Sequence, residues 1–465
     1  MLPGDVLLDI FDFCLGRLDD DSIYDRTKLW QTLVHVCQRW RHVVFQSPRR
    51  LDLQILCTIG TPAREMLDIW PAFPLIVLIQ KYTNVRDADM PDMKNILAAL
   101  EQRDRISTIS VGVSSRSKLE TLLPGPFPAL TSLNLISDDG AIPSATGSFL
   151  RESTTHLRHL HLETTTFPAL PKLLLSCTHL VTLTLRDVHH SEHVSPGVMA
   201  TCLFALTKLE SLELRFKYPT PQPDTENQLP DSWTRGALPA LTWFDFKGVS
   251  EYLEDLMVRI EAAPVLECLQ ITFFNQPTFH TPRLSQLISC VPKFQALDEA
   301  RVAIFGADIF VAVPSATRTL GHRLLTMGIP RRGCQPSSLA KLFISSLPLF
   351  LTVEHLYMTF PVVHWRNIKT TEWLELLSPF TSVKNLYLTK NYALRIVSAL
   401  QDSDLVNLEW GTKVLPALEN IFLDEPIRAE DSDLVQQAIE QFIHARQLFG
   451  HPIVVSQWVK GGNMW

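Results

Sequence analysis

The segment LVTLTL, from Leu180 to Leu185, has a spacing that recurs along most of the chain. The same Leu-x-x-Leu-x-Leu pattern appears as LTSLNL, LRHLHL and LESLEL, which begin at Leu130, Leu157 and Leu209, with looser copies that begin at Leu241, Leu266, Val353, Val383 and Leu418. Weaker candidates begin at Leu51, Ile106, Leu297 and near Leu324. Apolar residues at every second position predict a strand with one buried face. Successive starts differ by between 23 residues (157 to 180) and 32 residues (209 to 241).

Amphipathic helical patterns lie between the predicted strands. In SEYLEDLMVRIEAAPVL, one face carries Leu253, Leu256, Met257 and Ile260, and we expect Pro264 to end the helix. Strand–helix units at this spacing predict an α/β leucine-rich-repeat solenoid, with a parallel concave sheet and helices on the convex side. A doubly wound α/β domain would need longer crossovers and glycine-rich phosphate loops, which the sequence lacks.

We expect the solenoid to span residues 51–465 and to be irregular. The ninth repeat position, which is Asn or Cys in regular repeats, is occupied by Asp138, Thr165, Val188 and Lys217. The proline-rich segment 217–236 predicts a protruding loop. Residues 430–465 read as a helix that ends at Gly450, followed by a strand, and this pair is expected to cap the array.

The composition limits the class of protein. The chain has 465 residues, 46% of them hydrophobic and 20% charged, with a net charge of -7. This balance argues against disorder and against a basic nucleic-acid-binding surface. Eight cysteines without a Cys-x-x-Cys pair indicate a reducing compartment. No apolar run is long enough to cross a membrane, so we expect a cytoplasmic or nuclear protein.

The N-terminal 50 residues predict a small helical module. LPGDVLLDIFDFCL, from Leu2 to Leu15, has apolar residues at helical spacing, and KLWQTLVHVCQRWRHVVFQSP predicts a second helix that Pro48 ends. Two helices of this length enclose little core, so such a module usually needs a partner. On the pattern alone, two interpretations stay open: the helices cap the repeats, or they bind another protein.

This module resembles the F-box, because Leu-Pro opens the first helix and VCQRWR, from Val36 to Arg41, lies in the second. The resemblance implies that its apolar face binds the Skp-type adaptor of a cullin ubiquitin ligase. The implied adaptor-binding residues are Leu2, Pro3, Val6, Leu7, Ile10, Phe11, Leu33, Val36, Cys37, Trp40 and Val43. The chain departs from the family in its long polar connection, Gly16 to Thr27, and in the lack of residues before Met1-Leu2, so a truncated start and weaker binding both stay open.

The whole arrangement is similar to F-box proteins with degenerate leucine-rich repeats, which are abundant in mushroom-forming fungi. The stretches SPRRLDLQ and ARQLFGHPIVVSQW also resemble that family. The resemblance implies a non-catalytic substrate-recognition subunit, monomeric apart from the ligase complex, that binds an adaptor and a protein client. A repeat scaffold that does not direct ubiquitination is the alternative, and an enzyme with a site in a loop ranks third.

No motif for catalysis or a cofactor is apparent. His189, His190 and His193 lack further ligands at a suitable spacing, so we expect a polar loop rather than a zinc site. No Gly-x-Ser-x-Gly, phosphate-binding loop or His-Glu-x-x-His pattern occurs.

The residues that alternate with the buried leucines should face the concave side of the solenoid. Four aromatic residues at such positions, Trp243, Tyr357, Tyr387 and Phe422, are candidates for client binding. Alternatively, these side chains only favour the strands, and the C-terminal segment covers them.

Overall fold

The computed structural model describes most of the chain. The described residues are 2–16, 23–79, 94–113, 126–137, 154–164, 169–188, 194–217, 236–262, 265–274, 276, 279, 281–294, 298–305, 308–314, 323–330, 352–359, 369–389, 393, 395–400, 414–424, 432–448 and 450–457. They form two compact units: Met1–Val194 with Thr201–Leu209, and Ser195–Ala200 with Glu210–Trp465. Helix α9 (Pro196–Phe204) has residues in both units.

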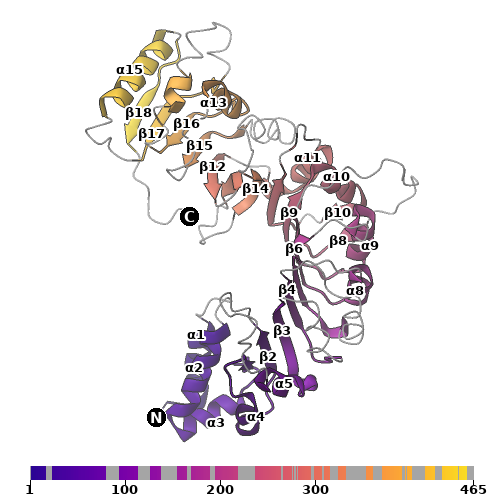
Figure 1. Ribbon diagram of the computed structural model, residues 1–465. Helices are drawn as coiled ribbons and strands as arrows, with labels where there is room; N and C mark the ends of the chain where they lie inside the picture. The colour runs from indigo at the N-terminus through magenta and orange to yellow at the C-terminus, as the bar shows by residue number, and fades with distance from the viewer. Residues whose placement is uncertain are drawn as a thin grey trace, which may run out of the picture. The chain divides into compact units, whose positions relative to one another are not determined.

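Unit 1 begins with three helices and continues with a parallel sheet (Figure 1). The helices are α1 (Gly4–Gly16), α2 (Ile23–Val36) and α3 (Gln38–Gln46). The strands follow in chain order: β1 (Ile55–Cys57), β2 (Leu75–Ile79), β3 (Ile106–Val113), β4 (Ser132–Ser137), β5 (His159–Glu163) and β6 (Thr182–Val188). Between them lie α4 (Ala63–Ile69), α5 (Lys94–Leu100), α8 (Leu170–Ser176) and the 3-10 turns η2 (Arg103–Arg105) and η4 (Thr154–His156).

Unit 2 contains a second stretch of strands. Their order in the sheet is β7 (Ser211–Phe216), β9 (Trp243–Gly248), β11 (Cys268–Phe273), β14 (Arg323–Pro330), β13 (Asp308–Pro314), β12 (Glu299–Phe305), β15 (His355–Thr359), β16 (Asn385–Leu388), β17 (Asn420–Leu423) and β18 (Val454–Gln457). A separate two-stranded sheet pairs β8 (Gly236–Leu238) with β10 (Ile260–Ala262). The helical elements are α10 (Ser250–Arg259), α11 (Pro282–Cys290), η6 (Pro292–Phe294), α13 (Thr370–Leu377) and α15 (Ser432–Leu448).

The strand repeat predicted from the sequence is confirmed. In each copy from Leu130 to Leu418, the strand begins at the third residue of the motif, as β6 begins at Thr182 in the copy from Leu180. The leucines of this copy, Leu180, Leu183 and Leu185, are fully buried. A single unit cannot bury this apolar side alone, so neighbouring units must stack. The chain therefore has an α/β repeat fold built on a large, mostly parallel sheet.

Neighbouring repeats are held in register by backbone carbonyl groups. The Thr131 carbonyl, just before β4, accepts the N–H groups of Arg158 and His159 at 2.8 and 3.0 Å. The Arg158 carbonyl likewise accepts two N–H groups of the next strand. In unit 2 the same double acceptance occurs at the carbonyls of Glu210, Thr242, Asp298, Glu354 and Lys384. This interaction depends on the backbone alone, so the repeats keep their register without a recurring ninth-position Asn.

Three expectations about the elements are wrong. Strands β12 and β14 occur where weak copies were predicted, but β13 between them runs antiparallel to both, and the three lie in reverse order between β11 and β15. The sheet is therefore not entirely parallel. The helix expected to continue to Pro264 ends at Arg259, because Ile260–Ala262 extend to pair with β8. The predicted second N-terminal helix is interrupted at Cys37, whose backbone is extended (φ -160°, ψ 167°).

The N-terminal helices pack on the first repeat of unit 1 through aromatic side chains. Trp30 of α2 is buried, and its indole N–H donates to the Gln54 carbonyl at 3.1 Å. Its ring lies edge-on to Trp70 and Phe73, with centroids 5.3 and 5.8 Å away. Phe45 of α3 contacts the same two rings. The helices are therefore anchored by one end of the module to the repeats.

The core of unit 2 contains a phenylalanine cluster around β7, β9 and β11. Phe216, Phe246 and Phe273 are fully buried, and Tyr252 of α10 contacts the first two rings. A Cβ atom added at Gly248 would lie 2.6 Å from Phe246 Cζ and 3.0 Å from Phe216 Cδ2. These rings are rigid and surrounded, so they have little room to move.

We expect Gly248→Ala to lower the free energy of unfolding of unit 2 by about 1–3 kcal/mol, the usual cost of overpacking a core. Gly60→Ala is the matched control, because no heavy atom lies within 4 Å of an added Cβ there. Urea unfolding followed by tryptophan fluorescence measures both variants. Equal midpoints for the two variants would contradict this packing.

Candidate functional site

Helix α1 carries two apolar rows with different environments. One row, Leu7, Phe11 and Leu15, is at most 4% exposed and packs within unit 1. The other row follows the same helical spacing but faces outward: Leu2 is 51% exposed, Val6 40%, Ile10 42% and Phe13 59%. A soluble surface rarely gathers this many large apolar side chains on one helix, and such a row is typical of a protein-binding surface. We call Leu2, Val6, Ile10 and Val36 the exposed row, since Val36 at the end of α2 is 55% exposed.

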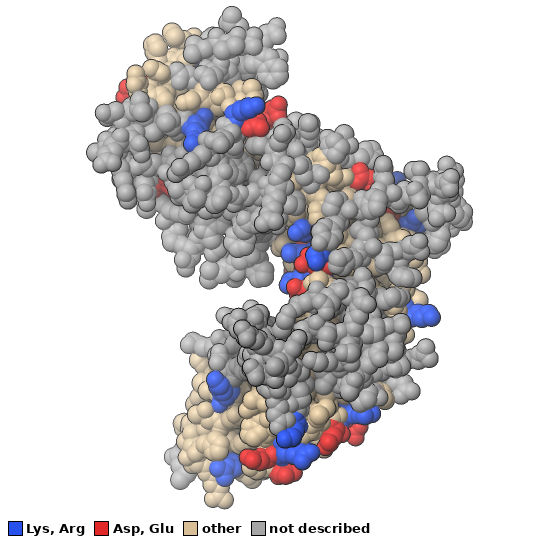
Figure 2. All heavy atoms as spheres, in the orientation of Figure 1, with Lys and Arg blue, Asp and Glu red and all other residues tan. Residues whose placement is uncertain are grey.

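The structure divides the residues that the F-box resemblance implied for adaptor binding. Leu2, Pro3, Val6, Ile10, Val36 and Cys37 are exposed, and Trp40 and Val43 are half-buried. By contrast, Leu7, Phe11 and Leu33 are buried inside unit 1. This corrects the expectation that these three side chains lie on the binding surface. Phe13 is exposed and was not predicted, although its spacing from Ile10 places it on the same side of the helix. In the lower part of Figure 2, where Figure 1 places α1–α3, tan side chains lie among several blue Lys or Arg and red Asp or Glu side chains.

The break at Cys37 positions the second half of this surface. The Cys37 thiol accepts the Trp40 backbone N–H at 3.5 Å and so caps α3. The turn brings the Trp40 ring against Phe11, with centroids 4.9 Å apart. A single continuous helix, as predicted, would not give α3 this separate direction.

In unit 2, three of the four predicted client-binding aromatics form a stack across neighbouring strands. Tyr357 of β15 and Tyr387 of β16 are paired in register, with ring centroids 4.0 Å apart and an interplanar angle of 8°. Phe422 of β17 continues the stack, 4.6 Å from Tyr387 at 12°. All three are half-buried and lie on the sheet face opposite the buried Leu386 and Leu388. We call these three residues the aromatic stack.

Polar groups surround the aromatic stack. The Arg301 guanidinium lies 5.3 Å from the Tyr357 ring centroid and bonds to Glu299 at 2.7 Å. The His355 Nδ1 lies 3.4 Å from the Tyr387 hydroxyl. Charged and amide groups beside stacked rings give a surface that can anchor a partner and fix its orientation.

The structure does not bring Trp243 into this stack. Trp243 lies on β9, and β11, β14, β13 and β12 separate β9 from β15 in the sheet. The register places Trp243 beside Ser211 and Cys268 instead. The predicted copies from Leu266, Leu297 and near Leu324 already lie between β9 and β15 in sequence, and the unpredicted strand β13 adds one more strand to the separation.

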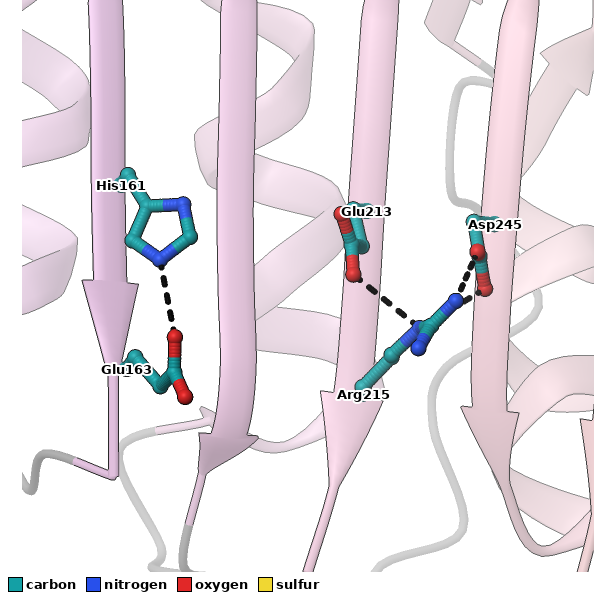
Figure 3. A network of polar contacts seen from close by, with 5 residues as sticks. All are labelled: His161, Glu163, Glu213, Arg215 and Asp245. Atoms are coloured by element: carbon teal, nitrogen blue, oxygen red, sulfur yellow. Dashed lines mark hydrogen bonds and ion pairs between the residues drawn. The ribbon is translucent and has the colours of Figure 1, made fainter. Parts of the chain in front are cut away.

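The sheet around β7 and β9 holds two buried carboxylates that are paired with one arginine. Arg215 lies between Glu213 and Asp245 (Figure 3). Its guanidinium forms an ion pair with Glu213 at 3.0 Å and donates to the two carboxylate oxygens of Asp245 at 3.2 and 2.5 Å. Both acids are 3% exposed at the side chain. A buried carboxylate needs such a partner, because burial without one costs several kcal/mol. Figure 3 also shows a separate pair within β5 of unit 1, His161 with Glu163 at 3.2 Å.

The described residues contain no group of three or more His, Cys, Asp or Glu side chains arranged to hold a metal ion. His189, His190 and His193 lie outside the described residues, as does the predicted loop from 218 to 235. Within the described part of the chain, no helix has the length and apolarity needed to cross a bilayer.

Comparison with known proteins gives little further information. No protein-family model matches the chain, and no curated protein is similar in sequence. Among solved structures, a similar chain is the leucine-rich repeat-containing protein LegL7 from Legionella pneumophila. It is 11% identical, and the match covers 72% of this chain and 90% of that one with a TM-score of 0.27. A likeness this weak carries no conclusion, so the repeat assignment rests on the strand register and burial described above.

One tyrosine of the aromatic stack, Tyr357, has a shifted pKa. Burial, followed by the charge of Glu299 and the neighbouring Tyr387, raises the pKa of Tyr357 well above its ordinary value. A raised pKa favours the neutral phenol in the folded state. This contribution to stability is present below about pH 10, the pKa of an unfolded tyrosine, and is lost as the pH rises toward the folded value.

We expect Tyr357→Phe to remove one late-titrating phenol from the alkaline absorbance titration of the folded protein. The variant should also lose less stability than the wild type between about pH 10 and 11. The same titration in concentrated denaturant is the control, because the shift requires the folded site. A late component that persists in the variant would contradict the assignment.

Proposed function

We propose that this chain is a non-catalytic protein-recognition subunit that joins two partners. The exposed row on α1 and α2 binds a Skp-type adaptor, and through it a cullin ubiquitin ligase. The aromatic stack on the sheet binds a protein client. In this role the chain performs no covalent step, because holding the client near the ligase raises the effective concentration of the reacting groups.

The exposed row is the observation that carries this proposal. Val6 and Ile10 are at least 40% exposed, although the adjacent row of the same helix is buried. Transfer of each such side chain from water to an interface is worth about 1.5–3 kcal/mol when burial is complete. The Leu-Pro opening and the VCQRWR segment give this surface its likeness to the F-box, and the resemblance supplies the identity of the partner. A cytoplasmic or nuclear location of this chain would bring it into the same compartment as such a ligase.

The aromatic stack supports the second half of the proposal. Its rings lie side by side on one face of the sheet, next to Arg301 and His355, and the stack is half-buried. Aromatic and arginine side chains are the residues most often found to dominate binding energy at protein interfaces. A repeat scaffold that binds both partners without ubiquitination would use the same two surfaces.

We expect a Val6→Asp, Ile10→Asp double variant to weaken adaptor binding at least 100-fold, because two carboxylates would have to be desolvated in an apolar interface. Both side chains point outward, so the helices should stay folded. Leu175→Asp is the matched control, since Leu175 is 47% exposed on α8, which lies between β5 and β6, several repeats from the N-terminal helices. Isothermal titration with purified adaptor measures all three proteins. Unchanged affinity in the double variant would overturn the adaptor assignment.

We also expect the adaptor to protect Cys37 from maleimide. Cys37 and Cys290 are both exposed, but only Cys37 belongs to the proposed surface. Burial raises the pKa of the Cys57 and Cys202 thiols to about 11 and that of Cys177 to about 12, so these thiols should react slowly with or without adaptor. Labelling followed by peptide mass spectrometry measures each site. Protection of Cys290 as strong as that of Cys37 would indicate a different contact.

Adaptor binding alone does not separate a ligase subunit from a scaffold. A reconstituted complex of this chain, adaptor and cullin should transfer ubiquitin to a bound client, and Tyr387→Ser should reduce that transfer while leaving adaptor binding unchanged. Client that stays bound but unmodified would support the scaffold instead.

A further inference from the structure

A pocket in unit 1 is not used by either proposed surface. It has a volume of about 410 Å³ and is lined by Ala129, Thr131, His156, Arg158, His179 and Lys208. Thr131 and Arg158 directly precede β4 and β5, so the pocket lies at the end of the sheet where these strands begin. We call it the basic pocket.

The lining side chains share one sign of charge. Arg158 and Lys208 are cations, His156 and His179 are bases, and no carboxylate lines the pocket. The described part of the chain offers no ion pair to Arg158 or Lys208. Lys208 Nζ instead lies 3.0 Å from His179 Nδ1, where a neutral imidazole accepts the ammonium hydrogen. Arg158 and Lys208 thus both line the basic pocket, and an anion bound there would be attracted to both cations.

The same edge in unit 2 is arranged differently. Glu354 and Lys384 directly precede β15 and β16, in the positions that Thr131 and Arg158 occupy before β4 and β5, and they form an ion pair at 2.8 Å. Glu267, just before β11, likewise pairs with Lys293 at 2.6 Å. Each of these cations is neutralised by an acid from a neighbouring repeat. In the basic pocket, Thr131 stands at the position that Glu354 occupies in unit 2, so Arg158 has no acid at this position.

We propose that the basic pocket binds a phosphomonoester group. Its dianion would accept hydrogen bonds from the planar guanidinium of Arg158, from the Lys208 ammonium and from the two imidazoles, a donor set suited to phosphate oxygens. The Thr131 hydroxyl is engaged with the Ser107 carbonyl at 3.0 Å, so it shapes the wall rather than donating to the ligand. The pocket is large enough for the phosphate and the group that carries it.

This site is independent of the proposed function, because none of its residues belongs to the exposed row or the aromatic stack. The phosphate can come from a small organic phosphate or from a phosphorylated side chain of another protein. Both sources present the same phosphate oxygens to the pocket. The experiment below distinguishes between them.

The test uses the full chain at fixed ionic strength, with inorganic phosphate, pyrophosphate and N-acetyl-phosphoserine amide as probes, and N-acetyl-serine amide as the uncharged comparison. We expect saturable binding of the phosphorylated probes by calorimetry. Arg158→Gln with Lys208→Gln should weaken it at least tenfold. The matched control, Lys28→Gln with Lys172→Gln, removes two exposed cations elsewhere in unit 1 and should change affinity less than twofold.

Tighter binding of the phosphoserine probe would support the pocket and assign the phosphate to a protein, and tighter binding of pyrophosphate would support it and assign a small molecule. The pocket residues are exposed, so circular dichroism should show that both double variants are folded. A His156→Ala, His179→Ala variant, which keeps both permanent cations, should weaken binding less than the Arg158 and Lys208 changes. Absence of saturable binding would overturn the proposal. Equal weakening in the Arg158→Gln, Lys208→Gln variant and in its control, the Lys28→Gln, Lys172→Gln variant, would also overturn it.

Discussion

The repeat architecture depends on a backbone carbonyl that, in most of the described repeats, accepts two consecutive N–H groups at the start of the next strand. At Thr131 and Lys384, in different units, the geometry is the same although the side chains have nothing in common. Because the interaction uses only the main chain, it places no demand on the ninth position of the motif. The sequence between strands can therefore vary in length and composition, while the leucines on the other face supply most of the favourable free energy through burial.

The buried side of the sheet was predictable because its signal repeats. Each leucine pattern marks a period of two, and the strand begins at the third residue of the motif in every copy from Leu130 to Leu418. The uninterrupted apolar run Leu75–Ile79 likewise forms a strand, β2, and all its residues are buried. The order of β12, β13 and β14 was not predictable, since periodicity indicates that a segment is a strand but not which neighbour it pairs with.

Candidate sites were predicted less completely than the fold, for related reasons. Spacing on a helix placed Val6 and Leu7 together as apolar, but only packing decides that Leu7 faces the core and Val6 the solvent. The motif placed Trp243 and Tyr357 at equivalent repeat positions, but four strands lie between β9 and β15 in the sheet, so the two side chains are not neighbours. The basic pocket has no motif at all: Arg158, His179 and Lys208 come from successive repeats and meet only because the strands stack. Residues at equal repeat positions are neighbours in space. When the repeats are aligned with one another, like charges that recur at one position are therefore a sequence signal for such a pocket.

The antiparallel strand β13 has a consequence for how unit 2 folds. Only Gly306 and Ala307 separate β12 from β13 in sequence, so this hairpin closes with little loss of chain entropy. The parallel neighbours β11 and β15 come from distant parts of the chain and do not pair with each other. Instead, β11 pairs with β14 and β15 pairs with β12, the two outer strands of the β12–β13–β14 group. A locally formed hairpin would thus act as the template on which the two flanking groups of repeats assemble, and unit 2 would gain cooperativity that a uniform repeat array lacks.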